Sequence, residues 1–229
     1  MRILVHHRTE YRYTQPLTQS VQYLRLTPRS GTSQTVNRWK IACPGADLTE
    51  WVDHYGNVCH TLAIARPITS VLIEVLGDVR TIDTNGVIPS GTTTLPFEVF
   101  LRETAYTQPD RALAKFAQKF RPPVEKDPIA GLHQLMLGVQ EAVAYEKNHT
   151  TVHTTAAETL AAGRGVCQDH AHVFIAACRQ LGVPARYVSG YLGHGEGTQQ
   201  TTASHAWAEA LVPDLGWVSF DCANGLSAT

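Results

Sequence analysis

The stretch that decides the fold of this chain reads Gly163-Arg164-Gly165-Val166-Cys167-Gln168-Asp169 and leads into a predicted helix. Beyond it, apolar or small residues recur at positions 171, 174, 175, 178 and 181, which is the spacing of one helical face. Gly182 and Pro184 then end the helix. Cys167 is therefore expected in the first turn, next to unpaired backbone N–H groups and the positive end of the helix dipole. Both features favour the thiolate, which is the nucleophilic form of cysteine.

Two alternating runs downstream, 205–212 and 217–221, predict a β-hairpin around the turn signal Pro213-Asp214-Leu215-Gly216. In the first run, small side chains share one face, which predicts close packing there: Ala206, Ala208, Ala210 and Val212. The opposite face holds His205 and Trp207. One compatible register sets His205 directly opposite Asp221 and Trp207 opposite Ser219. Cross-strand neighbours are close enough for an imidazole–carboxylate hydrogen bond.

Together, Cys167, His205 and Asp221 are predicted to form a catalytic unit for acyl transfer. His205 takes the thiol proton, and Asp221 fixes the orientation of the imidazole and stabilises its charge. Cys167 then attacks an amide or ester carbonyl and forms a thioester. The backbone N–H of Cys167, at the start of the helix, is a candidate oxyanion donor.

Each of the three residues also has a plain structural interpretation. Free cysteine is often a buried packing residue, a strand histidine can simply be hydrogen-bonded, and Asp221 could cap a turn with Asn224-Gly225. The glycines before Cys167 and the presence of both downstream partners favour the catalytic interpretation.

Two further residues, Gln168 and Tyr187, are candidates for the oxyanion site or the cleft lining, although each is more commonly a packing residue. His170 and His172 are two positions apart and point about 200° away from each other on a helix, so they cannot share one ion. The sequence also holds no acidic loop with calcium-binding spacing. We therefore expect no metal and no cofactor.

These motifs resemble the bacterial transglutaminase-like superfamily, whose members are often described as cysteine proteases of papain-like design. The resembling stretch runs from about Thr154 to Gly225 and includes Gly165-Val166-Cys167-Gln168-Asp169-His170, Gly182-Val183-Pro184-Ala185-Arg186-Tyr187, His205-Ala206-Trp207 and Phe220-Asp221. Weaker signals resemble the β-rich domain that precedes the core in many bacterial members: His7–Tyr13, Leu24–Arg29 and Asp53-His54-Tyr55-Gly56-Asn57. The resemblance implies the same catalytic residues, Cys167, His205 and Asp221.

The sequence departs from the family pattern in two places. Family members usually have a proline and a threonine after the aspartate, where this chain has Cys222 and Ala223. They also usually continue well beyond this strand, whereas this chain ends at Thr229. We expect either that C-terminal strands are missing from this sequence or that the protein is naturally short.

The order of elements predicts an α+β fold. Residues 1–85 hold short alternating strands, near 9–14, 20–26, 36–41, 58–64 and 70–75, and are expected to form an N-terminal antiparallel β-sandwich domain. Residues 86–107, with their Gly, Pro, Ser and Thr clusters, are predicted to be a linker. Residues 108–229 are expected to form a transglutaminase- or papain-like core, with the nucleophile at a helix N-terminus packed on an antiparallel sheet. Its predicted helices are 111–120, ended by Pro122-Pro123, then 128–144 and the Cys167 helix.

The composition suits a core-forming protein, since 43% of the 229 residues are hydrophobic and 17% are charged. The net charge of −1 disfavours a general nucleic-acid binder. We also expect no membrane association and a cytoplasmic location, because no run is long and apolar enough to span a bilayer and residue 6 is already polar. Five cysteines make an odd count, so free thiols are expected. Cys178 is predicted to pack in the core, and Cys43, Cys59 and Cys222 to be structural.

The favoured function is that of a thiol-dependent peptidase or amidase acting on a peptide or protein substrate through a Cys167 thioester. Hydrolysis and amine transfer share every step up to that thioester, so a protein-glutamine amine transferase, that is a transglutaminase, is an alternative. Hydrolysis is preferred because nothing in the sequence marks a lysine-binding site. A non-catalytic peptide-binding or scaffold module is the alternative from another class, and the oligomeric state stays open.

Overall fold

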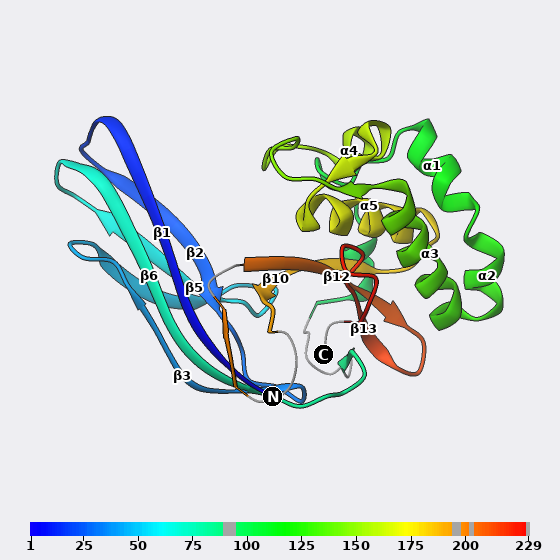
Figure 1. Ribbon diagram of the computed structural model, residues 1–229, viewed down its shortest axis with the longest axis horizontal. Helices are drawn as coiled ribbons and strands as arrows, with labels where there is room; N and C mark the ends of the chain where they lie inside the picture. The colour runs from blue at the N-terminus through cyan, green and yellow to red at the C-terminus, as the bar shows by residue number, and fades with distance from the viewer. Residues whose placement is uncertain (89–94, 194–197, 202–203, 228–229) are drawn as a thin grey trace. The chain divides into compact units, whose positions relative to one another are not determined.

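A computed structural model describes residues 1–88, 95–193, 198–201 and 204–227 of the chain (Figure 1). It contains two compact units. Unit 1 comprises Met1–Ile82 and Gly190–Ser204, and unit 2 comprises Asp83–Ser189 and His205–Thr229. Within the described residues, no helix combines the length and apolar character needed to cross a membrane.

Unit 1 is built from two sheets. One sheet has the order β11-β1-β6-β3 and the other has the order β2-β5-β4. The strands are β1 (Arg2–Leu17), β2 (Ser20–Thr27), β3 (Gln34–Ala42), β4 (Asp47–Val52), β5 (Val58–Ile64), β6 (Ile68–Thr81) and β11 (Thr198–Thr201). The five strands predicted in this region lie within β1, β2, β3, β5 and β6, whereas β4 was not predicted. Both sheets contribute to one hydrophobic core, through Leu24, Leu62, Ile64, Val71 and Ile73.

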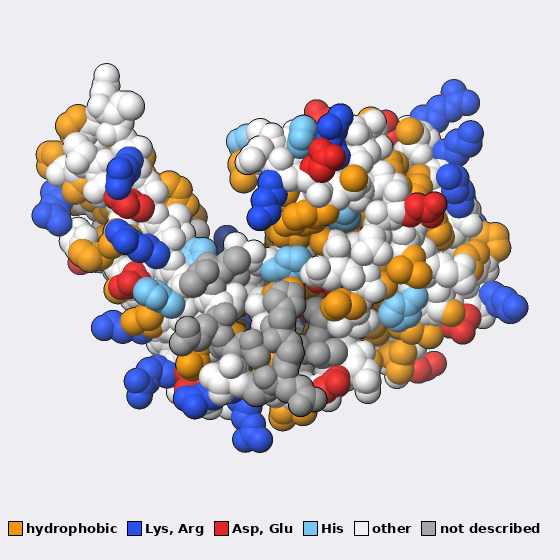
Figure 2. Space-filling view, viewed as in Figure 1, with side chains coloured by type: hydrophobic (Ala, Val, Ile, Leu, Met, Phe, Trp, Pro, Cys, Tyr) orange, Lys and Arg blue, Asp and Glu red, His pale blue; other side chains and the backbone are white. Residues whose placement is uncertain are grey.

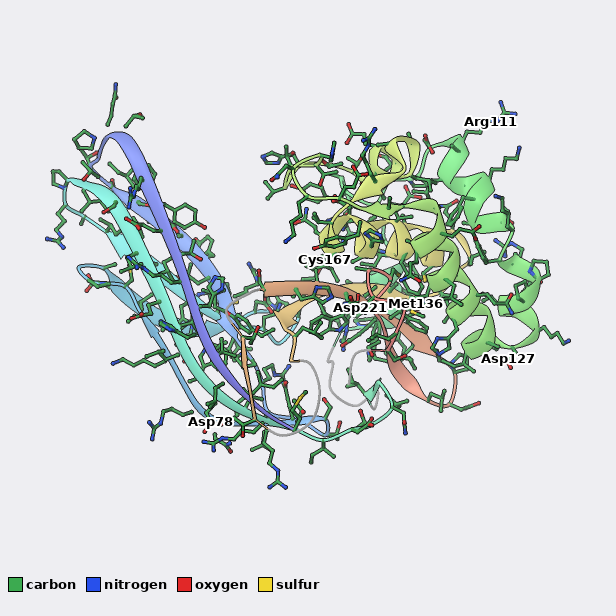
Figure 3. All side chains as sticks on the ribbon, in the orientation of Figure 1. Asp78, Arg111, Asp127, Met136, Cys167 and Asp221 are labelled. Carbon is green, nitrogen blue, oxygen red and sulfur yellow. The ribbon has the colours of Figure 1, made fainter. Side chains whose placement is uncertain are left out.

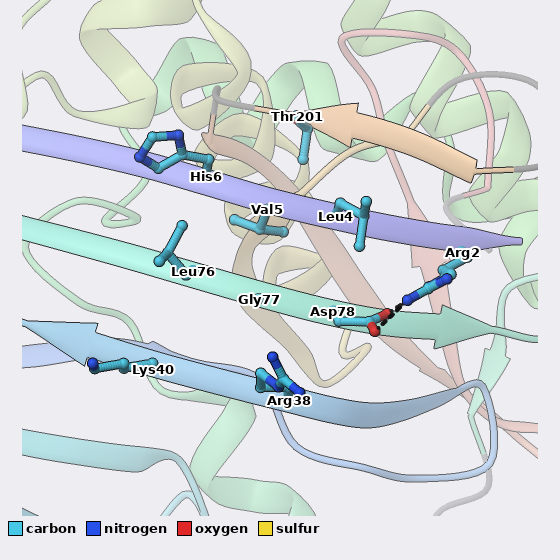
Figure 4. Close-up of a pocket in the computed structure, with 10 residues that line it drawn as sticks. All are labelled: Arg2, Leu4, Val5, His6, Arg38, Lys40, Leu76, Gly77, Asp78 and Thr201. Carbon is cyan, nitrogen blue, oxygen red and sulfur yellow. Dashed lines mark hydrogen bonds and ion pairs between the residues drawn. The ribbon is translucent and has the colours of Figure 1, made fainter.

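Side chains at the start of β1 alternate between the inner and the outer face of its sheet. Ile3 and Val5 are buried, whereas on the outer face Arg2 and His6 are exposed and Leu4 is half-buried. On that outer face lies an open depression across β1, β6 and β3 (Figure 4). At its edge Arg2 donates two hydrogen bonds to Asp78, at 3.0 Å and 2.8 Å.

A five-residue turn in unit 1 is organised by one carboxylate. Asp53 accepts hydrogen bonds from the backbone N–H groups of Tyr55 and Asn57, each at 2.9 Å, and from Arg25 at 3.1 Å. Burial acts to raise the pKa of this carboxyl, but the bonds from Asn57 and Arg25 outweigh it and lower the pKa to about 2. Asp53-His54-Tyr55-Gly56-Asn57 is thus a self-capped turn between β4 and β5.

The helices of unit 2 surround a central helix, α5. They are α1 (Arg111–Gln118), α2 (Arg121–Lys126), α3 (Pro128–Ala142), α4 (Ala156–Ala162) and α5 (Cys167–Gln180). Asp110 caps α1 by accepting the N–H of Leu113 at 2.7 Å. One face of α1 buries Leu113 and Ala117, and the opposite face exposes a row of cations along the edge of the unit (Figure 2): Arg111, Lys115 and Lys119.

Two helices differ from the sequence prediction. Pro122 and Pro123 were expected to end the helical segment, but they occupy the first turn of α2. Proline is tolerated there because the backbone N–H groups of the first helical turn have no partner within the helix, so the N–H that proline lacks costs no hydrogen bond. The second difference is α4, which was not predicted. A capping box formed by Thr155 and Glu158 starts this helix, and that pair of residues is readable in the sequence.

The central helix packs on the sheet β10-β12-β13-β7. Its strands are β10 (Ala185–Tyr191), β12 (Ser204–Val212), β13 (Gly216–Phe220) and β7 (Val87–Ile88). The predicted small-residue face of β12 is confirmed, because Ala206, Ala208, Ala210 and Val212 are all buried. Phe174 of α5 stacks on Phe220 of β13 with ring centroids 5.0 Å apart. This contact joins the helix that begins at Cys167 to the strand that leads into Asp221.

The segment 86–107, predicted to be a linker, contributes elements to unit 2 on both sides of residues 89–94, which lie outside the described ranges. Val87 and Ile88 form β7 and pair with β13. The short helix η2 (Phe97–Leu101) covers Trp217 on the face of the sheet opposite α5, with Phe100 at 4.9 Å from the indole. Arg179 donates a hydrogen bond to the carbonyl of Phe100 at 3.0 Å. These contacts attach the segment to the sheet of unit 2 and to α5.

Candidate active site

Cys167 is the first residue of α5. The turn before it is held by Asp169, whose carboxylate accepts the N–H of Val166 and the hydroxyl of Thr150, each at 2.7 Å. Gly165 is required at this point, since a Cβ there would lie 2.6 Å from the side chain of Asp169. Asp169 is therefore a carboxylate that shapes the start of the helix, in keeping with its position near the positive end of the helix dipole.

The thiol of Cys167 interacts with the ring of His205 and with the backbone N–H groups of Ala206 and Gln168. Burial alone raises the pKa of a thiol, but here the hydrogen bond with His205 and the two backbone N–H groups outweigh burial and lower the pKa of Cys167. The side chain is partly exposed, so a substrate carbonyl can reach it. A thiol with these properties has the character of a nucleophile.

His205 contacts Asp221 through its Nε2 atom, which lies 2.7 Å from Oδ2. Figure 3 labels Asp221 together with Cys167 at the start of α5. A carboxylate can only accept, so Nε2 carries the proton and Nδ1 is left to face the thiol of Cys167. The pKa of His205 is raised to about 9, first by the hydrogen bond with Asp221 and then by the bond with Cys167. The expected contact between His205 and Asp221 is therefore present.

The predicted register of the hairpin was wrong by two positions. Glu209 pairs with Ser219 and Val212 pairs with Gly216, so Asp221 lies beyond the last pair, Ala208 with Phe220, and is diagonal to His205. The difference arises at the turn, where Asp214 adopts a left-handed φ of 63° and Gly216 a φ of 96°. A shift of two positions keeps side chains on the same face, and diagonal neighbours remain within reach of long side chains.

Asp221 is fully buried, with 0% of its surface exposed. Burial tends to raise the pKa of this carboxyl, but hydrogen bonds from His205 and Asn224 outweigh it and hold the pKa below its usual value. The side-chain amide of Asn224 donates to Oδ2 at 2.7 Å. Asn224 was not among the predicted site residues, although the sequence placed it with Gly225 in a turn that Asp221 could cap, and the structure shows this turn.

The two candidate cleft residues, Gln168 and Tyr187, both lie close to the nucleophile. Gln168 contributes its backbone N–H to the sulfur, and its side chain is half-buried. Tyr187 is 40% exposed, and its pKa is raised to about 12 by burial and by the negative charges of Cys167 and Asp169. Tyr145, which the sequence did not single out, is also partly exposed, and its pKa is raised by burial and by the negative charges of Cys167 and Asp221.

The two histidines of α5, His170 and His172, contact different groups. His170 places its Nδ1 atom 2.9 Å from the carbonyl of Val166 and its Nε2 atom 2.8 Å from the carbonyl of Val143. His172 stacks between Tyr106 and Tyr187, with centroid distances of 5.5 Å and 5.2 Å. Throughout the described ranges, no three His, Cys, Asp or Glu side chains are grouped so that they could hold a metal ion.

Comparison with known proteins agrees with this architecture. Residues 115–222 match the transglutaminase-like superfamily, and residues 3–80 match the bacterial transglutaminase-like N-terminal region. An uncharacterised protein from Mycobacterium leprae is 30% identical over 245 residues, which cover 100% of this chain and 85% of the relative. The chain belongs to the transglutaminase-like superfamily. The family resemblance read from the sequence is thus confirmed.

Other relatives extend the comparison. An uncharacterised protein of Mycobacterium tuberculosis is 30% identical over 251 residues, covering 97% of this chain and 79% of the relative. A crystal structure from Cytophaga hutchinsonii, that of a proposed cysteine protease, superposes with a TM-score of 0.70 at 22% identity and covers 97% of this chain and 78% of that one. This likeness shows a shared fold of helices and antiparallel sheets. Membership in the superfamily places the chain among thiol-dependent acyl-transfer proteins.

Proposed function

We propose that the protein is a thiol enzyme that cleaves amide bonds in a peptide or protein substrate, with Cys167 as nucleophile, His205 as proton carrier and Asp221 as its orienting carboxylate. The observation that carries this proposal is the 2.7 Å contact from His205 Nε2 to Asp221 Oδ2. It leaves Nδ1 for the thiol and favours an imidazolium beside a thiolate. A plain structural histidine has no need of both partners.

The reaction proceeds through a thioester. The Cys167 thiolate attacks the carbonyl carbon of the amide and forms a C–S bond, while the carbonyl oxygen becomes negative. His205 gives its Nδ1 proton to the leaving nitrogen as the C–N bond breaks, and the amine departs. Water then attacks the thioester, and His205 Nδ1 accepts one of its protons. The C–S bond breaks, the carboxylic acid leaves, and the thiolate–imidazolium pair is restored.

Water is the favoured acceptor over an amine. A lysine-like acceptor needs an accessible negative group to hold its ammonium before deprotonation. The two carboxylates beside the nucleophile, Asp169 and Asp221, are only 1% and 0% exposed, and both are already hydrogen-bonded. Neither is available to an incoming ammonium, which supports hydrolysis.

Incubation of the protein with a glutamine-containing peptide and a labelled primary amine tests this proposal. We expect release of ammonia or of a peptide fragment, little amine incorporation, and a transient thioester adduct at Cys167 in intact-protein mass spectra. Cys167→Ala should abolish turnover, while the matched control Cys178→Ala, which removes a thiol buried in the same helix, should retain it. Robust amine incorporation would show that the protein is an amine transferase and would contradict the preference for hydrolysis. Turnover that survives Cys167→Ala would refute the mechanism altogether.

A further inference from the structure

We propose that Asn224 is a positioning residue of this site, whose side-chain amide holds the carboxylate of Asp221 in the orientation that aims His205 at Cys167. The inference rests on the proposed function, because it assigns a role within the same site. Neither the sequence motif nor the family match assigns this residue a task.

The geometry around one carboxylate oxygen carries the proposal. Asp221 Oδ2 accepts from Asn224 Nδ2 at 2.7 Å and from His205 Nε2 at 2.7 Å. The two nitrogens lie 3.3 Å apart. Since the Nε2 proton points to Asp221, His205 cannot accept from the amide, and the nitrogens are neighbours only because they share an acceptor. With the backbone N–H of Asn224 on Oδ1, donors therefore hold both oxygens of the carboxylate, and the side-chain amide of Asn224 is the second donor on the oxygen that His205 contacts.

The backbone holds Asn224 in place independently of its side chain. Asp221 donates its N–H to the carbonyl of Leu226 at 2.8 Å, and its own carbonyl accepts the N–H of Gly225 at 2.8 Å. Gly225 has a left-handed φ of 67°, and a Cβ there would lie 2.7 Å from Oε1 of Gln140 on α3. These backbone hydrogen bonds therefore fix the position from which the Asn224 amide donates to Asp221.

The burial of Asp221 explains why a second donor matters. A carboxylate with no exposed surface loses its hydration, and this loss favours the neutral acid. A neutral Asp221 would no longer favour a charged His205. Hydrogen bonds to the charged form oppose this, and Asn224 supplies one from its side chain and another from its backbone N–H, at 3.3 Å from Oδ1.

Asn224 could instead serve only to form the turn, and three variants separate these roles. Asn224→Asp keeps the size and the turn preference of the residue but replaces the donor with a second carboxylate facing Asp221. Gly225→Ala does the reverse, because it strains the turn and leaves the amide in place. Asn224→Ala removes the donor without adding charge.

The test is the pH dependence of Cys167 alkylation by iodoacetamide, measured with thermal melting to confirm that each variant is folded. Loss of the Asn224 amide raises the pKa of Asp221, and a neutral Asp221 favours the charged form of His205 less. The acid limb of the plot of Cys167 alkylation rate against pH should therefore move to higher pH. For Asn224→Asp we expect a shift of about one pH unit, which is about a ten-fold lower rate on that limb. Asn224→Ala should shift it less, and Gly225→Ala should lower the melting temperature without moving the limb.

The outcomes separate this inference from the proposed function. Fast wild-type labelling with an unchanged acid limb in both Asn224 variants overturns the positioning role alone. An equal shift in Gly225→Ala also overturns it, because strain in the turn would then explain the effect. Wild-type labelling no faster than that of a free thiol overturns the proposed function and this inference with it.

Discussion

At the scale of the residue, the site depends on a chain of polar contacts in which each group fixes the next. Asn224 donates to Asp221, Asp221 orients His205, and His205 acts on Cys167. The carboxylate of Asp221 is fully buried, so its negative charge is stabilised by the hydrogen bonds from Asn224 and His205 and by the positive charge of His205 in place of water.

Asp221→Asn should keep the fold but disable the site. The substituted amide leaves His205 free to adopt the tautomer with its proton on the wrong nitrogen, and loss of this orientation should lower turnover by about 10⁴-fold. Steady-state hydrolysis of a peptide substrate checks this. Asp214→Asn is the matched control, because Asp214 is exposed in the hairpin turn at a φ of 63°, which asparagine tolerates. Equal activity in the two variants would contradict the role of Asp221.

The pKa of His205 sets the alkaline side of the activity profile. Because it is raised to about 9, the imidazolium persists through neutral pH and is lost as the pH rises through about 9. Hydrolysis needs this proton for the leaving amine and should fall above that pH, whereas alkylation of Cys167 needs only the thiolate and should not. A pH series of both rates on one protein sample measures the difference. A parallel fall of the two rates would show that another group controls the alkaline limb.

The sequence singled out Cys167, His205 and Asp221 as site candidates because their residue types and neighbours suit acyl-transfer chemistry. Cys167 could be placed at a helix start by the glycines before it and the apolar periodicity after it. Asn224 could not be found in this way, since its contact depends on a turn geometry that spacing does not specify. The hairpin register was wrong for a similar reason, because left-handed conformations at Asp214 and Gly216 set the turn.

At the scale of the element, the site depends on how closely α5 lies on its sheet. Ala208 and Ala210 of β12 are completely buried in the core that α5 shares. Alanine at these positions allows α5 to approach β12 closely. Cys167 on α5 and His205 on β12 are therefore carried by two closely packed elements. The strand pattern predicted this close face correctly.

Ala210→Leu should push α5 away from β12. Overpacking of this kind typically costs about 1–3 kcal/mol, and here it should also lower the reactivity of Cys167, because the helix carries the nucleophile. Thermal melting and iodoacetamide labelling measure the two effects. Ala112→Leu on the exposed side of α1 is the control and should change neither. A stable Ala210→Leu variant with normal labelling would argue against close packing as a determinant of the site.

At the scale of the whole molecule, the chain passes from unit 2 into unit 1 and back between Ser189 and His205. The segment includes β11, whose residues Thr198–Thr201 pair in parallel with Arg2–Val5 of β1. The sequence suggested a plain succession of an N-terminal part and a core, because pairing between segments nearly two hundred residues apart leaves no local pattern.

Because β11 pairs with β1, its hydrogen exchange should differ between the full chain and a fragment spanning residues 83–229. In the fragment, β11 has lost its partner strand, so its backbone amides should exchange rapidly with deuterium. In the full chain they should be protected. Hydrogen exchange followed by mass spectrometry of a peptide covering Thr198–Thr201 makes the comparison, and a peptide from α3 serves as the internal control. Equal protection of β11 in both samples would contradict this pairing.

The central claim is that Cys167 is a thiolate paired with the imidazolium of His205, and the ultraviolet absorbance of the thiolate during a pH titration tests it most directly. The difference between wild type and Cys167→Ser isolates the signal of this sulfur. We predict a thiolate signal that persists well below the usual thiol pKa of 9.0 and returns toward that value in His205→Ala. A wild-type titration centred near the usual value, unchanged by His205→Ala, would contradict the account.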